Sequence, residues 1–108
     1  MRDGLYRVTF QTQVGYGSGV VYLCGGRIWG GDAAIFYTGS YSNDDNGEFV
    51  ADVTTGRHTA DAGASVFGKD SVHIKLQGRS NGEAANLAGS ALEAPGIAFR
   101  ARIERIAA

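Results

Sequence analysis

Hydrophobic and polar positions alternate along most of the chain, as they do in β-strands that have one buried and one solvated face. Near the N-terminus, Tyr6, Val8 and Phe10 are separated by single polar residues. The same alternation is found in three later segments, residues 49–54, 72–79 and 97–104. Because the runs are short and closely spaced, the pattern predicts a protein built from many short strands.

Turn signals separate these runs. The dipeptides typical of tight turns are Gly25-Gly26, Asn81-Gly82 and Pro95-Gly96. After the third predicted strand, Asp32 is expected to close a turn by accepting hydrogen bonds from backbone N–H groups. The 17 glycines lie between the β-rich segments rather than in one linker, which is typical of turns and bends in a sheet.

The spacing of the runs predicts one all-β domain over residues 1–108. About eight antiparallel strands at intervals of roughly 10–14 residues suit an up-and-down barrel or a strongly curved sandwich. We favour the barrel because closure removes the exposed edges of a sheet. The stretch near residues 58–67 lacks strand character, and it is expected to form a short helical turn or an irregular loop.

Two predicted strands carry apolar residues on both faces, which a monomeric barrel does not need. The additional apolar residues are Val20 and Tyr22 on one strand and Ala34 and Phe36 on the other. They predict an outer face through which the protein forms a homodimer. Alternatively, the segment 58–67 covers this face.

Small residues occupy many of the predicted inward positions in the last three strands. Large aromatic residues elsewhere, namely Tyr6, Phe10, Trp29 and Phe99, would have to fill the remaining volume. If they do so, the barrel has an ordinary packed core. If they do not, the same four side chains line a hydrophobic pocket.

Composition and charge narrow the possible functions. The 108 residues include 10 Lys and Arg against 11 Asp and Glu, and this net charge of −1 argues against bulk electrostatic binding of nucleic acid. No apolar run reaches the ~20 residues of a membrane-spanning helix. The N-terminal residues show no apolar signal segment, and the single cysteine fits a reducing compartment. We therefore expect a cytoplasmic protein that binds neither nucleic acid nor membrane directly.

Few residues could carry catalysis or hold a metal. His58, Asp61 and Ser65 lie close together in sequence, whereas a catalytic triad is assembled from distant segments. One cysteine and two histidines without metal-ligand spacing do not make a zinc site. The closely spaced glycines at 15–19 precede a strand rather than the helix of a phosphate-binding loop. We expect a protein that is not an enzyme and has no cofactor or metal.

The polar loop after the fourth predicted strand offers a different kind of site. Asp44, Asp45 and Glu48 place three carboxylates at the tip of one hairpin. Such a tip could complement a basic surface on a protein partner and accelerate encounter with it. The alternative is a solvated turn without a partner.

Four motifs occur together in the first half of the chain: Asp3-Gly4-Leu5-Tyr6, Gly17-Ser18-Gly19, Gly26-Arg27-Ile28-Trp29-Gly30-Gly31-Asp32 and Tyr37-x-Gly39-x-Tyr41. Together they resemble the GrlR-like family, small bacterial proteins named for a negative regulator of type III secretion genes. The resemblance implies a lipocalin-like barrel that dimerises and binds a transcriptional activator through an acidic loop. Here that loop corresponds to Asn43-Asp44-Asp45-Asn46.

Two functional hypotheses follow from these observations. The first is a regulatory barrel that sequesters a transcription regulator or another protein partner through its acidic loop. The second is a barrel that carries a small apolar, lipid-like molecule in its interior. They differ in which part of the molecule is functional, the outer surface or the inside.

Overall fold

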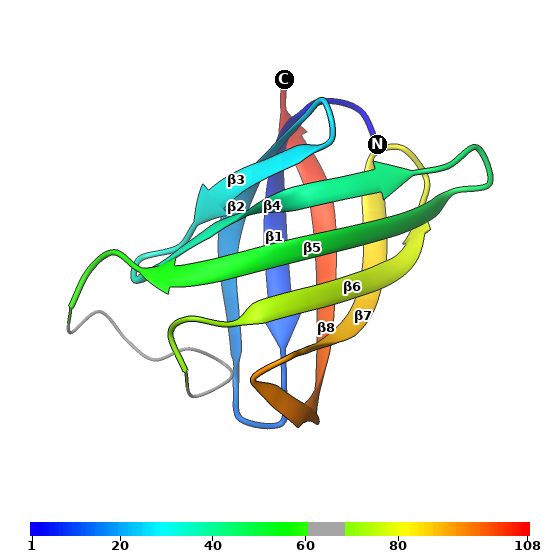
Figure 1. Ribbon diagram of the computed structural model, residues 1–108. Helices are drawn as coiled ribbons and strands as arrows, with labels where there is room; N and C mark the ends of the chain where they lie inside the picture. Colours follow the sequence, from blue (N-terminus) through cyan, green and yellow to red (C-terminus); the bar gives the residue numbers. More distant parts are fainter. Residues whose placement is uncertain (61–68) are drawn as a thin grey trace.

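The computed structural model describes residues 1–60 and 69–108, and these form a closed barrel of eight antiparallel strands (Figure 1). The strands are β1 (Gly4–Gln11), β2 (Tyr16–Cys24), β3 (Arg27–Gly31), β4 (Ile35–Asn43), β5 (Glu48–Arg57), β6 (His73–Ser80), β7 (Ala84–Ala91) and β8 (Ala94–Ala107). Each strand pairs with its neighbour in sequence, and β1 also pairs with β8. The prediction of an up-and-down barrel is therefore confirmed, and the open sandwich is excluded.

The irregular segment predicted near residues 58–67 is only partly described. Residues 58–60 follow β5 without regular secondary structure, and residues 61–67 of the prediction lie outside the described residues. Of the residues described, none belongs to a helix long and apolar enough to cross a membrane.

The tight turns form where glycine permits them. In the hairpin that joins β2 to β3, Gly25 and Gly26 have φ angles of 57° and 84°. Positive φ at both central residues is the requirement of a type I′ turn, whose twist matches that of the flanking strands. The Gly-Gly signal in the sequence therefore fixes the register in which Tyr22 lies opposite Trp29.

Alternation along each strand decides which side chains enter the barrel. On β5, Phe49 and Ala51 point inward and are buried, whereas Val50 points outward. The same rule buries Phe99, Ala101 and other apolar side chains of β8. The barrel interior is therefore the only large apolar environment that the described strands share.

One end of the barrel is filled by side chains, and we call it the closed end. Tyr6 is completely buried there, and its hydroxyl donates a hydrogen bond of 2.5 Å to the carbonyl of Arg2. The backbone N–H of Arg2 in turn donates to the carbonyl of Gly82 at 3.2 Å. Next to them, the rings of Tyr41 and Phe49 stack with their centroids 5.3 Å apart. The N-terminal residues thus close this end.

The opposite end, which we call the mouth, has a less complete wall. β3 is short, so β2 pairs with it only from Val20 to Cys24. Residues 16–19 of β2 pair with β1 alone. The connection from β3 to β4 lies at this same end, where both the strongly exposed Tyr16 and the exposed Ala33 border the interior.

Candidate functional site

The barrel interior contains a cavity of about 300 Å³. Most of the side chains that line it are aliphatic or aromatic, among them Val8, Val21, Leu23, Ile28, Phe49, Leu76, Leu87 and Ile103. The lining residues come from all eight strands, and residues 32–34, which border the mouth, complete the lining. The cavity is therefore a continuation of the hydrophobic core that the core residues do not fill.

Small side chains explain why the space remains. Ala51 on β5 and Ala101 on β8 face the cavity at positions where a Leu or Phe would occupy it. Gly17 also lines it, and a Cβ at this position would come within 2.8 Å of the ring of Phe10. Of the small inward residues predicted in the last three strands, Ala101 alone lines the cavity, whereas Ala51 and Gly17 lie on strands outside that prediction.

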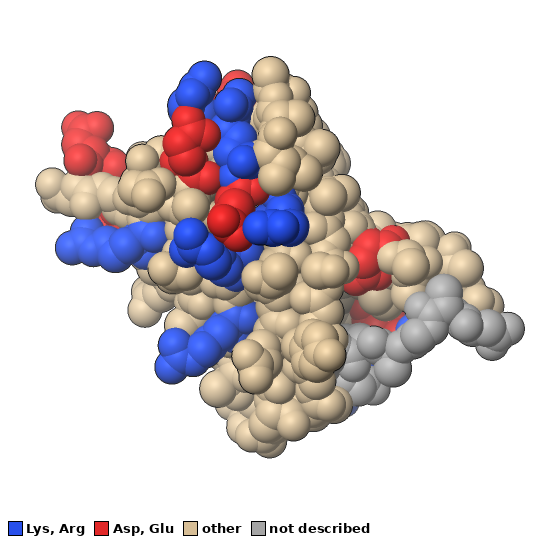
Figure 2. Space-filling model, turned by 180° about the vertical axis from the view of Figure 1, so that it is seen from behind, with Lys and Arg blue, Asp and Glu red and all other residues tan. Residues whose placement is uncertain are grey.

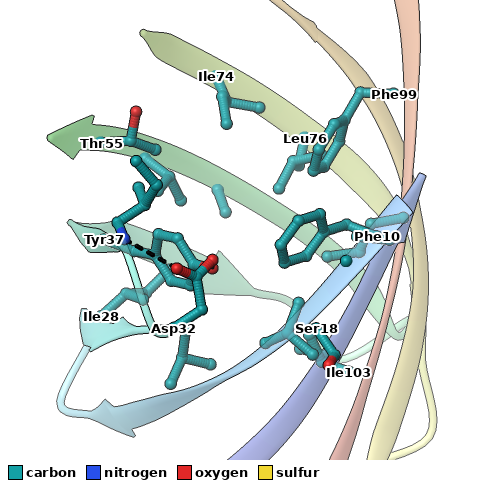
Figure 3. Close-up of a pocket in the computed structure, with 18 of the residues that line it drawn as sticks. Phe10, Ser18, Ile28, Asp32, Tyr37, Thr55, Ile74, Leu76, Phe99 and Ile103 are labelled. Atoms are coloured by element: carbon teal, nitrogen blue, oxygen red, sulfur yellow. Dashed lines mark hydrogen bonds between the residues drawn. The ribbon is translucent and has the colours of Figure 1, made fainter. Parts of the chain in front are cut away.

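An aromatic cluster stands beside the cavity near the mouth (Figure 3). The ring of Phe10 stacks on Phe99 at a centroid distance of 6.1 Å and meets the edge of Tyr37 at 6.2 Å. Both geometries are favourable arrangements of aromatic quadrupoles. Phe10 thereby connects the β8 side of the cavity to the β4 side.

Asp32 is the polar centre of the mouth. One of its carboxylate oxygens accepts hydrogen bonds from the backbone N–H groups of Ala34, at 2.9 Å, and Ile35, at 2.8 Å. The turn predicted for Asp32 is therefore confirmed. Its other carboxylate oxygen accepts a hydrogen bond from the hydroxyl of Tyr37. Gly19 makes room for this pair, because a Cβ there would lie 3.0 Å from the Tyr37 hydroxyl oxygen.

These hydrogen bonds set the ionisation of both groups. Burial alone would raise the pKa of Asp32, but the hydrogen bonds from Tyr37, Ala34 and Ile35 outweigh it and lower the pKa below its ordinary value. Burial, together with the neighbouring carboxylate, raises the pKa of Tyr37. At neutral pH the mouth therefore holds an ionised carboxylate and a neutral phenol.

Thr55 is a further polar residue of the cavity lining, and its hydroxyl is satisfied within the protein. The Thr55 hydroxyl donates to the carbonyl of Asp70 at 2.7 Å and accepts from the N–H of Val72 at 3.1 Å. His58 lies outside the cavity lining, with Nε2 2.8 Å from the backbone oxygen of Asp32. Throughout residues 1–60 and 69–108, no buried side-chain nitrogen or oxygen lacks a hydrogen-bond partner.

Two of the four predicted pocket residues line the cavity, and two do not. Phe10 and Phe99 do. Tyr6 is buried at the closed end, where its ring helps to fill the core. Trp29 is 47% exposed on the outer face, because Ile28 takes the inward position on β3. The pocket prediction was wrong for Trp29, since the five-residue strand gave too little alternation to fix its register.

Three of the four predicted dimer residues share the outer face of the barrel. Val20, Tyr22 and Phe36 are each 39–42% exposed, and Trp29 joins them, since it lies opposite Tyr22. We call these four side chains, three aromatic rings and Val20, the outer aromatic patch. Ala34 is buried at 5% exposure and lines the cavity, because its backbone N–H is held by Asp32 before β4 begins. Its assignment to the outer face was wrong.

Of the three predicted acidic residues, Asp44 and Asp45 lie on the turn between β4 and β5 and Glu48 is the first residue of β5; all three are exposed. One carboxylate oxygen of Asp44 accepts hydrogen bonds of 2.9 Å from the N–H groups of Asn46 and Glu48. The guanidinium of Arg79 donates to the carbonyl of Asn46 at 2.8 Å. Asp44 therefore shapes the turn, which leaves Asp45 and Glu48 as its freely presented carboxylates. This turn belongs to the closed end.

Basic residues gather on the opposite side of the barrel from the view of Figure 1, with acidic residues among them (Figure 2). Glu104 lies 2.9 Å from Arg7 and 3.6 Å from Arg102. These ion pairs partly neutralise the basic surface.

The described histidine and carboxylate side chains do not gather into a metal site. His73 pairs with Glu93, with 2.5 Å between Nδ1 and a carboxylate oxygen. Within the described residues, no three side chains of His, Cys, Asp or Glu gather as metal ligands would.

Comparison with known proteins identifies no matching family model and no curated protein of matching sequence. The site must therefore be interpreted from its own geometry. Sequence reasoning found the turn role of Asp32, but it missed the hydrogen bond from Tyr37 and the position of both groups at a cavity. The available signal was the alternation around Ile35 and Tyr37, which places the phenol on the inner face only three strand positions beyond the turn.

Proposed function

We propose that the barrel binds a small apolar molecule in its interior. The observation that carries this proposal is the apolar cavity of about 300 Å³ beside the mouth. Native interiors are close-packed, with few voids larger than a water molecule. An apolar cavity of ~150 Å³ is already enough to bind benzene. A space twice that size is a binding site rather than a packing defect.

The volume also indicates the size of the ligand. One water molecule, which has a single non-hydrogen atom, occupies about 30 Å³ in the liquid. By this measure the cavity accommodates on the order of ten non-hydrogen atoms. Its long aliphatic walls and its aromatic cluster favour a hydrocarbon chain or a small ring system over a sugar or a nucleotide. The mouth provides the few polar groups that orient such a ligand.

Titration of the protein with 1-octanol, followed by isothermal calorimetry, tests this proposal. Ala101→Leu places a larger side chain in the cavity and is expected to weaken binding at least tenfold. Ala88→Leu, on the exposed face of the neighbouring strand β7, adds the same atoms outside the barrel and should bind as the wild type does. Circular dichroism checks that both variants remain folded.

Failure of the wild type to bind 1-octanol would overturn the proposal, whatever the variants do. Equal weakening by Ala101→Leu and Ala88→Leu would place the binding site outside the cavity. Native mass spectrometry of gently purified protein adds an independent readout. A reproducible bound mass of a small molecule supports the proposal and supplies the natural ligand for identification.

The outer aromatic patch favours a second candidate function, a dimeric regulatory barrel that sequesters a protein partner. Four large apolar side chains exposed on one face are unusual for a monomer. This candidate also agrees with the resemblance to the GrlR-like family, and the partner would be a transcription regulator. The acidic turn lies at the closed end, so binding of a protein there and of a ligand at the mouth could coexist.

Analytical ultracentrifugation tests the dimer. The wild type is expected to sediment as a dimer, and Trp29→Ser with Phe36→Ser as a monomer. Capture of a purified candidate regulator tests the acidic turn. Asp45→Asn with Glu48→Gln should weaken capture, whereas Asp44 is kept because it shapes the turn. Capture that is unchanged by these two substitutions removes the turn from the hypothesis.

A further inference from the structure

The described part of the cavity lining carries negative charge and no positive charge. Among the described residues that line it, Asp32 is the only charged side chain, and no Lys, Arg or His takes part. The eight residues from 61 to 68 add no basic side chain, because their sequence is Asp-Ala-Gly-Ala-Ser-Val-Phe-Gly. Inside the cavity, a ligand that carries its own carboxylate would therefore find no basic side chain and would face a carboxylate of like charge. Arg100 and Arg102 line a neighbouring hollow and are not among the cavity residues.

The carboxylate of Asp32 has room for another donor. An ionised carboxylate offers about four acceptor positions. Two backbone N–H groups and the Tyr37 hydroxyl occupy three of them, and all three are neutral donors. In the part of the chain that the structure describes, no Lys, Arg or His forms an ion pair with Asp32. His58 makes its hydrogen bond to the backbone oxygen of Asp32, and its charge is the last and smallest of the causes that lower the pKa of the carboxyl group.

We propose that the cavity selects apolar ligands that end in a protonated amine, with the ammonium group bound at the mouth by the carboxylate of Asp32. This inference rests on the proposed function above and names the class of ligand. The hydrocarbon part lies against the aliphatic walls, and Phe10 and Tyr37 flank the path to the carboxylate (Figure 3). An ammonium group donates charge-assisted hydrogen bonds, which are stronger than those of a hydroxyl. An ammonium group that lies over the face of an aromatic ring is also held by a cation–π attraction.

A series of octyl compounds with different end groups tests this selection. Calorimetry at neutral pH compares octylamine, 1-octanol and octanoate, whose hydrocarbon chains are the same. The wild type is expected to bind octylamine about tenfold more tightly than 1-octanol, and octanoate at least tenfold more weakly than 1-octanol. Equal affinities, or a preference for octanoate, would overturn the inference but leave the proposed function intact. Absence of binding by all three overturns both.

Two variants and a control assign the preference to Asp32. Asp32→Asn keeps an acceptor for the backbone N–H groups and removes the charge, so octylamine binding should fall to the level of 1-octanol. Tyr37→Phe keeps the carboxylate and frees one acceptor position, so the preference for octylamine should persist or increase. Asp52→Asn removes an exposed carboxylate on the outer face of β5 and should change nothing. If the preference survives in Asp32→Asn, or is lost in Asp52→Asn, the amine is not bound at Asp32.

Discussion

The closed end and the mouth of the barrel are built from the same eight strands but are packed differently. At the closed end, Tyr6 and Phe49 are at most 1% exposed and fill the interior with large rings. Beyond these rings, Ala51 and Ala101 leave a cavity that Phe49 also lines, and nearer the mouth Phe10 is only partly buried. The difference shows that barrel closure supplies the fold, whereas the size of the inward side chains decides where the fold is solid and where it can bind.

The polar groups follow the same division. At the closed end, the Tyr6 hydroxyl donates to a backbone carbonyl and serves only the structure. At the mouth, the Tyr37 hydroxyl donates to a carboxylate that still has an acceptor position available. Two tyrosines on inner faces thus have different roles because one meets the backbone and the other meets an ionised side chain.

Truncation of the large rings gives the largest expected difference between the two ends. Phe49→Ala should lower the free energy of unfolding by about 3–5 kcal/mol, because it removes a ring that is 1% exposed and stacks on Tyr41, although it also lines the cavity. Phe10→Ala removes a partly buried ring beside existing space, and about 1–2 kcal/mol is expected. Urea denaturation of both variants measures this, with the exposed Val50→Ala as a control that stays near the wild type. Equal losses for the two phenylalanines would show that the mouth is packed as tightly as the closed end.

Removal of single hydroxyl groups gives a smaller and more specific comparison. Tyr6→Phe should cost about 1–2 kcal/mol of stability, because the part-buried hydrogen bond from this hydroxyl to the carbonyl of Arg2 is lost. Tyr37→Phe should cost no more than about 1 kcal/mol, since Asp32 keeps two backbone N–H donors.

The two tyrosine variants also differ in what else they change. In Tyr37→Phe the pKa of Asp32 should rise, because the hydrogen bond from the phenol is one of the causes that lower it. An NMR titration of the Asp32 carboxyl follows this shift, and Tyr6→Phe should leave that titration unchanged. A pKa of Asp32 that stays the same in Tyr37→Phe would mean that the phenol does not stabilise the ionised form.

The sequence predicts the strands and their order better than it predicts the cavity, for physical reasons. Alternation with a period of two and the Gly-Gly and Asn-Gly turns are local signals, and they were enough to predict the number and order of the strands. The cavity depends on which inward residues from distant strands meet, and a single sequence does not contain that information. Trp29 illustrates the limit, because a strand as short as β3 offers few positions from which to read its inward face.

Residues near the strand ends show the same limit. Ala34 follows the alternation of β4 when the sequence is considered alone, but the hydrogen bond between its N–H group and Asp32 places it in the turn before the strand. Its small side chain is therefore buried at the cavity instead of facing outward. Side-chain to backbone hydrogen bonds of this kind override a period-two pattern at a strand boundary.

The smallest expected effect is the dependence of stability on the charge of Asp32. Its pKa in the folded protein is lower than the value of ~3.9 for an unperturbed aspartate, so the ionised form stabilises the fold. This contribution is fully present above about pH 4 and is lost as the pH falls through the folded pKa. Asp32→Asn has no such charge. The stability advantage of the wild type over Asp32→Asn should therefore persist from neutrality to pH 5 and shrink below about pH 4, as urea denaturation across this range can measure. An advantage that grew as the pH fell would mean that the mouth favours the protonated acid, and the carboxylate would then be unsuited to holding a cation.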